Sequence, residues 1–233
     1  MNISFMKTPT FNDDGVEIKT LPFLQTEDVR QLTDDVYSDF TPARNAKNQL
    51  SRGVRWGVMV NGEVHWTKQN SYQLSAKLNE EEGGNVRIMD LVPDRFLKHD
   101  AIRCLINEAF QTYYPNECTE LQAFGIQVSA IRYEPSVTKT CYPSPDRPHQ
   151  DGFDNGIFVL NRTDNLIGGQ TRVFTLEDQL MYEANLEAGQ AVFVRDDSWK
   201  HQVLPMMVDT QVAGSETRCY RDILIVRITR IKR

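Results

Sequence analysis

The sequence lacks several features that would assign it to a particular class of protein. Its four cysteines are scattered and form no CxxC pair, so neither a zinc cluster nor a disulfide framework is expected. Acidic residues outnumber basic ones, 32 to 26, which argues against a general nucleic-acid-binding protein, because phosphate binding needs clustered lysine and arginine. The basic C-terminal run RITRIKR alternates with isoleucine, which is more typical of a strand that ends in a solvated tail.

Long apolar runs are also missing. No stretch approaches the roughly 18 apolar residues of a membrane-spanning helix. The first residues, MNISFMKTPTFNDDG, lack the basic start and apolar run of a signal peptide. With reduced thiols, these features predict a cytoplasmic protein that binds neither membranes nor nucleic acids. At 233 residues the chain is long enough for one domain with a substantial core, and its composition does not indicate an oligomeric state.

Over residues 1–115 the sequence predicts a mixed region with two helices and a hairpin. This region is expected to pack on the core. A helix is expected after Thr26, which can cap it, because apolar residues share one face of TEDVRQLTDDVY. The segment WGVMVNGEVHW predicts a hairpin that turns at Asn61 and Gly62. The segment LNEEEGGNVRIMDLVP, residues 78–93, is expected to be polar and flexible, with a turn at Gly83 and Gly84. A second helix is expected from Pro93 to about Tyr113, with a buried stripe at Leu97, Ala101, Leu105 and Ala109.

Residues 116–233 have a different character. Runs of strand-forming residues, such as GIFVLNRT, QAVFVRD and RDILIVRITR, alternate with turns rich in glycine, proline, asparagine and aspartate. Short strands separated by regular turns indicate an all-β sandwich or barrel. The sequence therefore predicts one mainly β domain with flanking helices, in which the second helix covers one face of the core.

The chain has only four histidines, and two of them suggest a metal site. His149 and Asp151 are separated by one residue, so on an extended chain both side chains point to the same face. His201 begins a predicted strand 50 positions after Asp151. Two imidazoles and a carboxylate form the facial triad of non-haem Fe(II) sites, which leaves three coordination positions open. The HxD pair alone is also compatible with a polar turn in which His149 bonds Asp151.

A basic residue on the last strand would complete such a site. Arg221 is a candidate because a guanidinium there can form a charge-assisted pair with the far carboxylate of 2-oxoglutarate. Arg218 and Arg227 compete for this role, and Arg227 shares the face of Arg221 if the strand is regular. Alternatively, Arg221 pairs with Asp222 or with an acidic loop.

With this order of residues, the chain resembles the Fe(II)/2-oxoglutarate-dependent dioxygenases. More narrowly, it is similar to the bacterial free-amino-acid hydroxylases that include L-isoleucine 4-hydroxylase. The resembling segments are AIRYEP, RPHQDGFDN, NLIGGQTRVF, KHQVLPM and YRDILIVRITR. The resemblance covers roughly residues 79–230, and the segment DGFDN departs from the isoleucine enzyme, so isoleucine itself is not carried over as the substrate.

The resemblance implies a double-stranded β-helix (jelly-roll) core. It implies that His149, Asp151 and His201 bind Fe(II), and that Arg221, in preference to Arg218, anchors 2-oxoglutarate. With O2 as the second cosubstrate, the implied reaction hydroxylates an unactivated C–H bond of a free L-amino acid and releases succinate and CO2. A carboxylate at position 151 points away from the related halogenases, which have a small residue there.

Substrate residues are predicted from chemistry and position. A zwitterionic amino acid needs a cation for its carboxylate, for which Arg55, Arg87 and Arg132 are candidates. It also needs an anion or a carbonyl for its ammonium, and Asp154 is a candidate anion. The aromatic residues Phe153, Phe158 and Trp199 are candidate pocket walls. One of Asp196 and Asp197 is expected to orient His201. Each of these residues has an alternative role in the core, in a turn or at the surface. One alternative function is the same iron chemistry on a carrier-bound amino acid, a peptide or another small metabolite, with hydroxylation, desaturation or epoxidation as the outcome. Another is a non-enzymatic jelly-roll binding domain.

Overall fold

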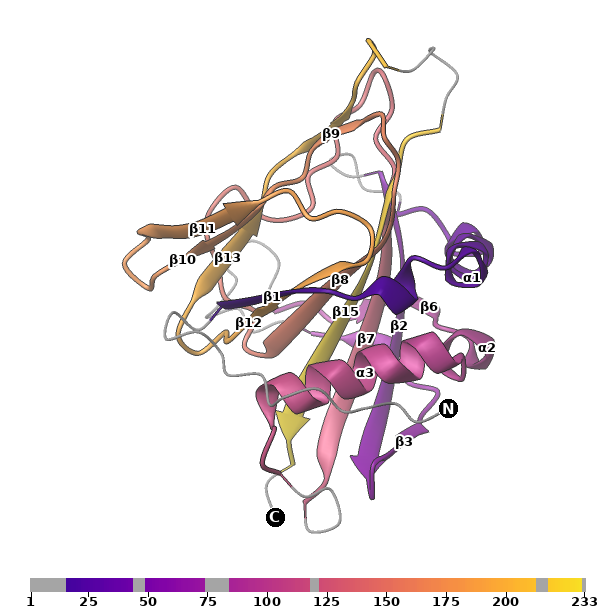
Figure 1. Cartoon of the computed structure of the whole chain (residues 1–233), viewed down its shortest axis with the longest axis vertical. Coiled ribbons are helices and arrows are strands. Elements are labelled where there is room, and N and C mark those ends of the chain that lie inside the picture. Colours follow the sequence, from indigo (N-terminus) through magenta and orange to yellow (C-terminus); the bar gives the residue numbers. More distant parts are fainter. Residues whose placement is uncertain (1–15, 44–48, 74–83, 118–121, 213–217, 232–233) are drawn as a thin grey trace.

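The computed structural model describes residues 16–43, 49–73, 84–117, 122–212 and 218–231. Its main sheet contains β1 (Val16–Thr20), β2 (Leu50–Val60), β3 (Glu63–Trp66), β6 (Asp90–Leu91), β7 (Phe124–Tyr133), β8 (Asp154–Arg162), β12 (Gln190–Val194) and β15 (Arg221–Arg230). The strand order is β1-β12-β8-β15-β7-β2-β3, and β6 pairs with β2 (Figure 1). The long strands β7, β8 and β15 form its centre.

Shorter strands complete the fold. A smaller sheet of order β11-β10-β13 contains β10 (Thr171–Phe174), β11 (Leu180–Ala184) and β13 (Lys200–Val203). β9 (Leu166–Gly168) pairs with β14 (Met206–Val208), and β4 (Ser71–Tyr72) pairs with β5 (Arg87–Ile88). Figure 1 shows the smaller sheet to the left of the main sheet.

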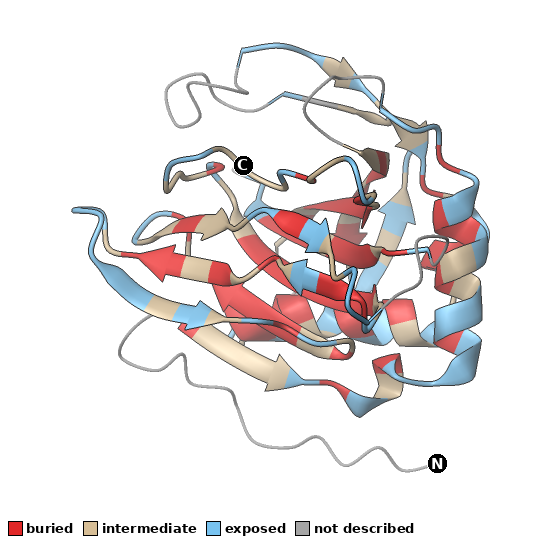
Figure 2. Cartoon of the chain, turned by 90° about the horizontal axis from the view of Figure 1, so that it is seen from above, coloured by how far each residue is buried: buried red, intermediate tan, exposed pale blue. Residues whose placement is uncertain are grey.

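Three helices cover the other face of the main sheet: α1 (Glu27–Ser38), α2 (Asp94–Leu97) and α3 (Asp100–Tyr113), after a 3-10 turn, η1 (Pro22–Leu24). The helices turn their buried residues toward the sheet and their exposed residues outward (Figure 2). Val36, Phe96 and Leu105 of the helices belong to the same buried apolar cluster as Leu224 of β15. Burial of this cluster is the main force that holds the helices to the sheet.

The two faces of the main sheet pack against different partners. Successive residues of a strand point to opposite faces, and directly paired residues share a face. Leu224 pairs with Ala130 in the cluster under the helices, whereas Ile223 pairs with Ile131 in a second cluster, which includes Val173 of β10. We call these two faces the helix-facing side and the barrel-facing side. Strand register therefore places every residue of β7, β8 and β15 on one side or the other.

The structure confirms the mainly β fold class and several local predictions. The Thr26 hydroxyl accepts a hydrogen bond from Val29 N at 3.4 Å, and α1 begins at the next residue, Glu27. Asn61 and Gly62 have φ angles of 51° and 76° at the turn between β2 and β3, as the hairpin requires.

Other local predictions need correction. The second predicted helix is two helices, because Lys98 ends α2 and the His99 imidazole caps α3 by accepting a hydrogen bond from Ala101 N. The strand predicted to begin at His201 is β13, which ends at Val203; Pro205 has no N–H to donate, and a separate strand, β14, begins only after it. In the segment predicted to be flexible, residues 78–93, the first six lie outside the described residues, and the described remainder contains the short strands β5 and β6. β1 and β2 are members of the main sheet, so the boundary placed at residue 115 does not separate two layers.

Candidate metal centre

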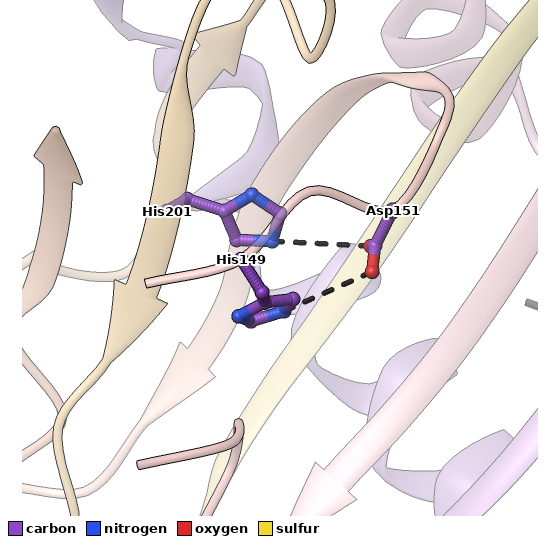
Figure 3. A group of neighbouring side chains, drawn as sticks. All are labelled: His149, Asp151 and His201. Atoms are coloured by element: carbon purple, nitrogen blue, oxygen red, sulfur yellow. Dashed lines mark ion pairs between the residues drawn. The ribbon is translucent and has the colours of Figure 1, made fainter. Parts of the chain in front are cut away.

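The structure brings the three predicted metal ligands together. One ligand atom from each of His149, Asp151 and His201 lies within 4.8 Å of the others. His149 Nε2 is 3.8 Å from Asp151 Oδ1, and His201 Nε2 is 3.8 Å from Asp151 Oδ2. Figure 3 shows both imidazoles directed toward the carboxylate. Two imidazole nitrogens and one carboxylate oxygen are a donor set that suits Fe(II).

Backbone hydrogen bonds set the separation of the two histidines. His149 N donates to His201 O at 3.1 Å, and His201 N donates to His149 O at 2.9 Å. Such a reciprocal pair places two side chains on the same face, and the ring centres are 4.5 Å apart. Gln150 instead donates from its side-chain amide to the backbone carbonyl of Asp196. The HxD spacing therefore directs the side chains of His149 and Asp151 to the same side, as predicted.

Arg227 of β15 fixes the Asp151 carboxylate. Its Nη2 donates to Asp151 Oδ2 at 2.7 Å, its Nε to Asn155 Oδ1 at 2.8 Å, and its Nη1 to Gln127 Oε1 at 2.9 Å. Burial alone would raise the pKa of Asp151, but the charge of Arg227, together with the two neighbouring imidazoles, holds that pKa well below its usual value. Asp151 is therefore an anion in a buried position.

His201 is prepared for metal binding by its surroundings. Burial, together with the neighbouring His149, lowers the pKa of His201 to about 4. The imidazole is consequently neutral at neutral pH, which is the form that binds metals.

Asp196 holds the turn that carries Asp151. Its carboxylate accepts hydrogen bonds from Asp151 N, at 3.0 Å, and from Gly152 N. Asp196 Oδ1 is 3.7 Å from His201 Nδ1, which is too long for a hydrogen bond. Asp197 is exposed and accepts a hydrogen bond from Ser198. The prediction that one of the two aspartates orients His201 is thus wrong for Asp197, while Asp196 supports the site through the backbone.

Arg221 begins β15 on the barrel-facing side and is only 2% exposed. Its Nη1 donates to Gly169 O at 2.7 Å, and its Nε is buried without a hydrogen-bond partner among the described residues. Asp222, an alternative partner, points to the helix-facing side. Burial lowers the pKa of Arg221 to about 10, since no described carboxylate is bonded to this charge.

Two glycines allow Arg221 to approach the backbone. Gly168 and Gly169 have φ angles of 82° and 76°, which other residues rarely adopt. A Cβ atom on Gly168 would lie 2.0 Å from Pro205 O, and one on Gly169 would lie 3.1 Å from Arg221 Nη1. The Gly-Gly pair in NLIGGQ is therefore required for the packing around Arg221.

Two of the predicted substrate arginines lie on the wrong side of the sheet. Arg132 donates to both carboxylate oxygens of Asp222, at 2.6 and 2.7 Å, on the helix-facing side. Arg55 is in register with Val128 on that side, and it donates to Val92 O at 2.9 Å and to Asp94 Oδ1 at 2.8 Å. The sheet separates both guanidiniums from Asp151, so the prediction that they bind substrate is wrong.

Asp154 and Phe158 are also on the helix-facing side. Asp154 pairs with Ile228, a member of the helix-facing cluster, and burial raises its pKa. Phe158 packs against Phe193 in the same cluster, with ring centres 5.4 Å apart. Their predicted roles in the substrate pocket are wrong, because each strand residue next to a site-facing one points away from the site.

The remaining predicted residues lie on or beside the barrel-facing side. The Phe153 ring centre is 6.0 Å from the guanidinium carbon of Arg227, close to Asp151. Trp199 packs against the barrel-facing cluster. Phe153 is therefore placed near the triad, and Trp199 lies against the barrel-facing cluster.

Arg87 lies on β5, which joins β4 in a ribbon beside the barrel-facing side of β2. Trp56 Nε1 donates to Ser71 O of this ribbon at 2.7 Å, and Trp56 and Met89 both pack against Val54. Trp56 is in register with Gln127, whose side chain contacts Arg227, so it faces the barrel. Sequence reasoning did not single out Trp56.

Among the helices that the structure describes, none combines the length and apolar character needed to cross a lipid bilayer.

Comparison with known proteins extends these observations. The family model described as 2OG-Fe dioxygenase matches residues 27–227. No curated protein sequence matches the chain. Among solved structures, IDO from Bacillus thuringiensis superposes with a TM-score of 0.75 at 19% identity, over 95% of this chain and 96% of that one. A bsmA homolog from Methylobium petroleophilum gives 0.73 at 15% identity, over 92% and 88%.

A third similar structure is the Fe(II)/α-ketoglutarate-dependent dioxygenase TqaL, with a TM-score of 0.60 at 11% identity, over 93% of this chain and 83% of that one. These likenesses show a shared jelly-roll fold, and the narrower resemblance to isoleucine hydroxylase stays a prediction. Because the family model spans most of its length, the chain belongs to the 2OG-Fe dioxygenase family, enzymes that use Fe(II), 2-oxoglutarate and O2, and His149, Asp151 and His201 are its iron-binding triad.

Proposed function

We propose that the enzyme hydroxylates an unactivated C–H bond of a free L-amino acid, with 2-oxoglutarate consumed to succinate and CO2. The proposal rests on the presence of both a metal site and a separate buried cation on the barrel-facing side. The triad provides a metal site, and Arg221 provides a buried cation that is bonded to no described carboxylate. Iron, when bound, supplies the oxidative chemistry, and the protein supplies position and shielding.

Arg221 is proposed as the anchor for the far carboxylate of 2-oxoglutarate. Its competitors are occupied: Arg218 Nε donates to Glu134 Oε1 at 2.6 Å, and Arg227 donates to Asp151. A carboxylate ligand would give Arg221 Nε the charge-assisted hydrogen bond that it lacks in the described protein.

The amino-acid end of the pocket is proposed on the side of β2 and the β4–β5 ribbon. Of the predicted arginines, Arg87 is proposed to meet a substrate carboxylate, because its strand β5 lies beside the barrel-facing side of β2. Phe153 and Trp199 are proposed as apolar walls, together with Trp56. Asp154 is not part of this proposal, and the ammonium partner is left unassigned.

The residues of the chain have separate tasks in the proposed reaction. Arg227 holds Asp151 Oδ2, which fixes the carboxylate relative to both imidazoles. The backbone pair between His149 and His201 keeps the two rings at a set separation. The barrel-facing cluster excludes water around the site. Fixed ligands and a dry pocket favour reaction at one carbon, because position decides which C–H bond is attacked.

A substrate panel tests the proposal directly. Fe(II)-loaded enzyme with 2-oxoglutarate and O2 is offered each free L-amino acid, its N-acetyl derivative and its methyl ester. Succinate release and a product heavier by one oxygen atom are measured by mass spectrometry. We expect at least one free amino acid to be turned over while both of its blocked derivatives fail. Turnover of a blocked derivative as fast as the free acid would contradict the proposed substrate class and would favour a carrier-bound or peptide substrate.

A further inference from the structure

A second buried arginine lies directly beside Arg221. Arg162, the last residue of β8, is in register with Arg221 across the β8–β15 pair. Its side chain is only 6% exposed. Side chains paired in this way have Cβ atoms about 4.5–5.5 Å apart, and like charges at such positions repel. The sheet thus brings two guanidiniums together in a buried place.

A β-bulge turns Arg162 to the barrel-facing side. Asp222 pairs with Asn161 but Ile223 pairs with Val159, so Leu160 is an extra residue in β8. Without the bulge, Asn161 would face the barrel and Arg162 would face the helices. Instead, Asn161 Nδ2 donates to Asp222 at 3.2 Å on the helix-facing side. Bulges often re-aim a side chain next to an active site.

The two arginines hold the same turn from two directions. Arg162 Nη2 donates to Leu166 O at 2.9 Å, and Arg221 Nη1 donates to Gly169 O at 2.7 Å. Each still has a buried nitrogen with no hydrogen-bond partner in the described protein, Nη1 of Arg162 and Nε of Arg221. The buried hydroxyl of Thr171, two residues after Gly169, also has no hydrogen-bond partner in the described protein.

Thr171 faces these arginines from the smaller sheet. It pairs with Val203 on β13, and Val173, two residues later, pairs with the metal ligand His201. Thr171, Val173 and His201 therefore point to one side of the smaller sheet, toward the barrel interior. Val173 belongs to the barrel-facing cluster, which supports this placement.

The local charge is not balanced by the described protein. The carboxylate recorded near Arg162 is that of Glu187, with Oε2 3.7 Å from Nε, and this side chain is 64% exposed. Burial of two cations with one distant, solvent-exposed carboxylate is energetically unfavourable unless an anion binds between them. The unpartnered nitrogens of the two guanidiniums and the unpartnered Thr171 hydroxyl together match the acceptor capacity of a carboxylate, which has two oxygens and about four lone-pair sites.

We propose that Arg162 and Arg221 together hold the far carboxylate of 2-oxoglutarate, with the Thr171 hydroxyl as a third donor. This inference rests on the proposed function, in which Arg221 alone is the anchor. The second cation makes the pocket selective for 2-oxo acids that carry a second carboxylate, and it also holds the product succinate.

Binding to the anaerobic Fe(II) enzyme, measured by calorimetry without turnover, tests this role. 2-Oxoglutarate is compared with 2-oxopentanoate, which has the same carbon chain but no far carboxylate. We expect Arg162→Met to weaken 2-oxoglutarate binding by about 10- to 100-fold, the range for loss of one charge-assisted hydrogen bond. Binding of 2-oxopentanoate should stay within about twofold, because it makes no such bond. Arg162→Lys, which keeps the charge, should retain more of the preference than the Met variant.

Thr171→Val keeps the test decisive if the Arg162 variants do not fold. It should lower the preference for 2-oxoglutarate by about 10-fold, the lower end of the range for a hydrogen bond to a charged group.

The alternatives give different results. Equal weakening of both acids by Arg162→Met would show that Arg162 acts only through the turn after β8, and no change in either would show that it plays no part; both overturn the proposal. If Arg221→Met removes the preference for 2-oxoglutarate over 2-oxopentanoate while Arg162→Met keeps it, the role proposed for Arg162 is wrong but the proposed function stands. If the wild-type enzyme shows no preference for 2-oxoglutarate, the proposed function fails as well.

Discussion

Buried arginines on the two faces of the main sheet have different hydrogen-bond partners. On the helix-facing side, Arg132 meets both oxygens of Asp222 and also Asp34 Oδ1 at 2.9 Å. On the barrel-facing side, Arg221, next to Asp222 in the chain, is bonded to one backbone carbonyl. Both arginines are almost completely buried. The difference is therefore in the partners and not in exposure.

This contrast separates a structural charge from a functional one. A buried ion pair with its hydrogen bonds satisfied holds elements together, although it adds little net stability. A buried cation whose polar atoms lack partners is unfavourable in the protein alone and becomes favourable when an anionic ligand binds. The barrel-facing side, which also carries the triad, is thus built to receive ligands. Four predictions test this contrast.

The largest effect is expected at the triad, where Asp151 and Asp154 lie on opposite faces. Asp151→Ala should abolish succinate release, because it removes one of three metal ligands and the local negative charge. Mn(II) binding, followed by electron paramagnetic resonance, should be lost with it. Asp154→Asn is the matched control on the helix-facing side and should keep both properties. Metal binding in Asp151→Ala at wild-type affinity would show that the triad is wrongly assigned.

Breaking the helix-facing ion pair should affect stability but not ligand binding. Arg132→Met leaves Asp222 buried and without its main partner, so the free energy of unfolding should fall by about 3–5 kcal/mol. Urea denaturation measures this change. The affinity of the folded variant for 2-oxoglutarate should stay within about twofold of wild type. A loss of stability under about 1 kcal/mol would mean that the pair is not a structural link.

The reverse pattern is expected for Arg221→Met. Affinity for 2-oxoglutarate should fall by about 100-fold, which corresponds to about 2.7 kcal/mol. Stability without ligand should be unchanged or higher, since the variant removes a buried charge bonded to no described carboxylate. In thermal unfolding, a given concentration of 2-oxoglutarate should stabilise the wild-type Mn(II) protein more than the variant. A variant that is destabilised and still binds the cosubstrate would reverse the contrast between the two faces.

The smallest effect is expected for a neutral hydrogen bond on the helix-facing side. The Tyr37 hydroxyl of α1 donates to Ile223 O of β15 at 2.9 Å in a buried position. Tyr37→Phe should lower the free energy of unfolding by about 1 kcal/mol. Cosubstrate affinity should not change. A measurable loss of cosubstrate affinity would indicate that the two faces are coupled through β15.

Much of the fold could be predicted because its signals are local. RDILIVRITR coincides with β15, and the Asn61-Gly62 turn is where the pattern places it. The break between α2 and α3 was missed, since Leu97 and Ala101 keep helical spacing across it. A cap made by a histidine side chain leaves no clear mark in the sequence. The single-domain organisation stays a prediction.

Prediction of the site succeeded where two residues share a short segment and failed where register decides. The i, i+2 spacing places His149 and Asp151 on one face whatever the topology. Whether Arg55, Arg132 or Asp154 faces the barrel depends on strand pairing, which no local pattern reveals. The bulge at Leu160 that exposes Arg162 to the barrel carries no glycine signal. The role of Arg227 was missed for the same reason, because Asp151 reaches it only in the folded chain.

The most direct test of the account is an anaerobic titration of the Fe(II)-loaded protein with 2-oxoglutarate. Cosubstrate bound at the iron produces a weak charge-transfer band in the visible range. The account predicts this band in the wild-type protein, its absence in Asp151→Ala, and saturation at much higher 2-oxoglutarate concentrations in Arg221→Met. A folded, iron-loaded wild-type protein that shows no band would contradict it.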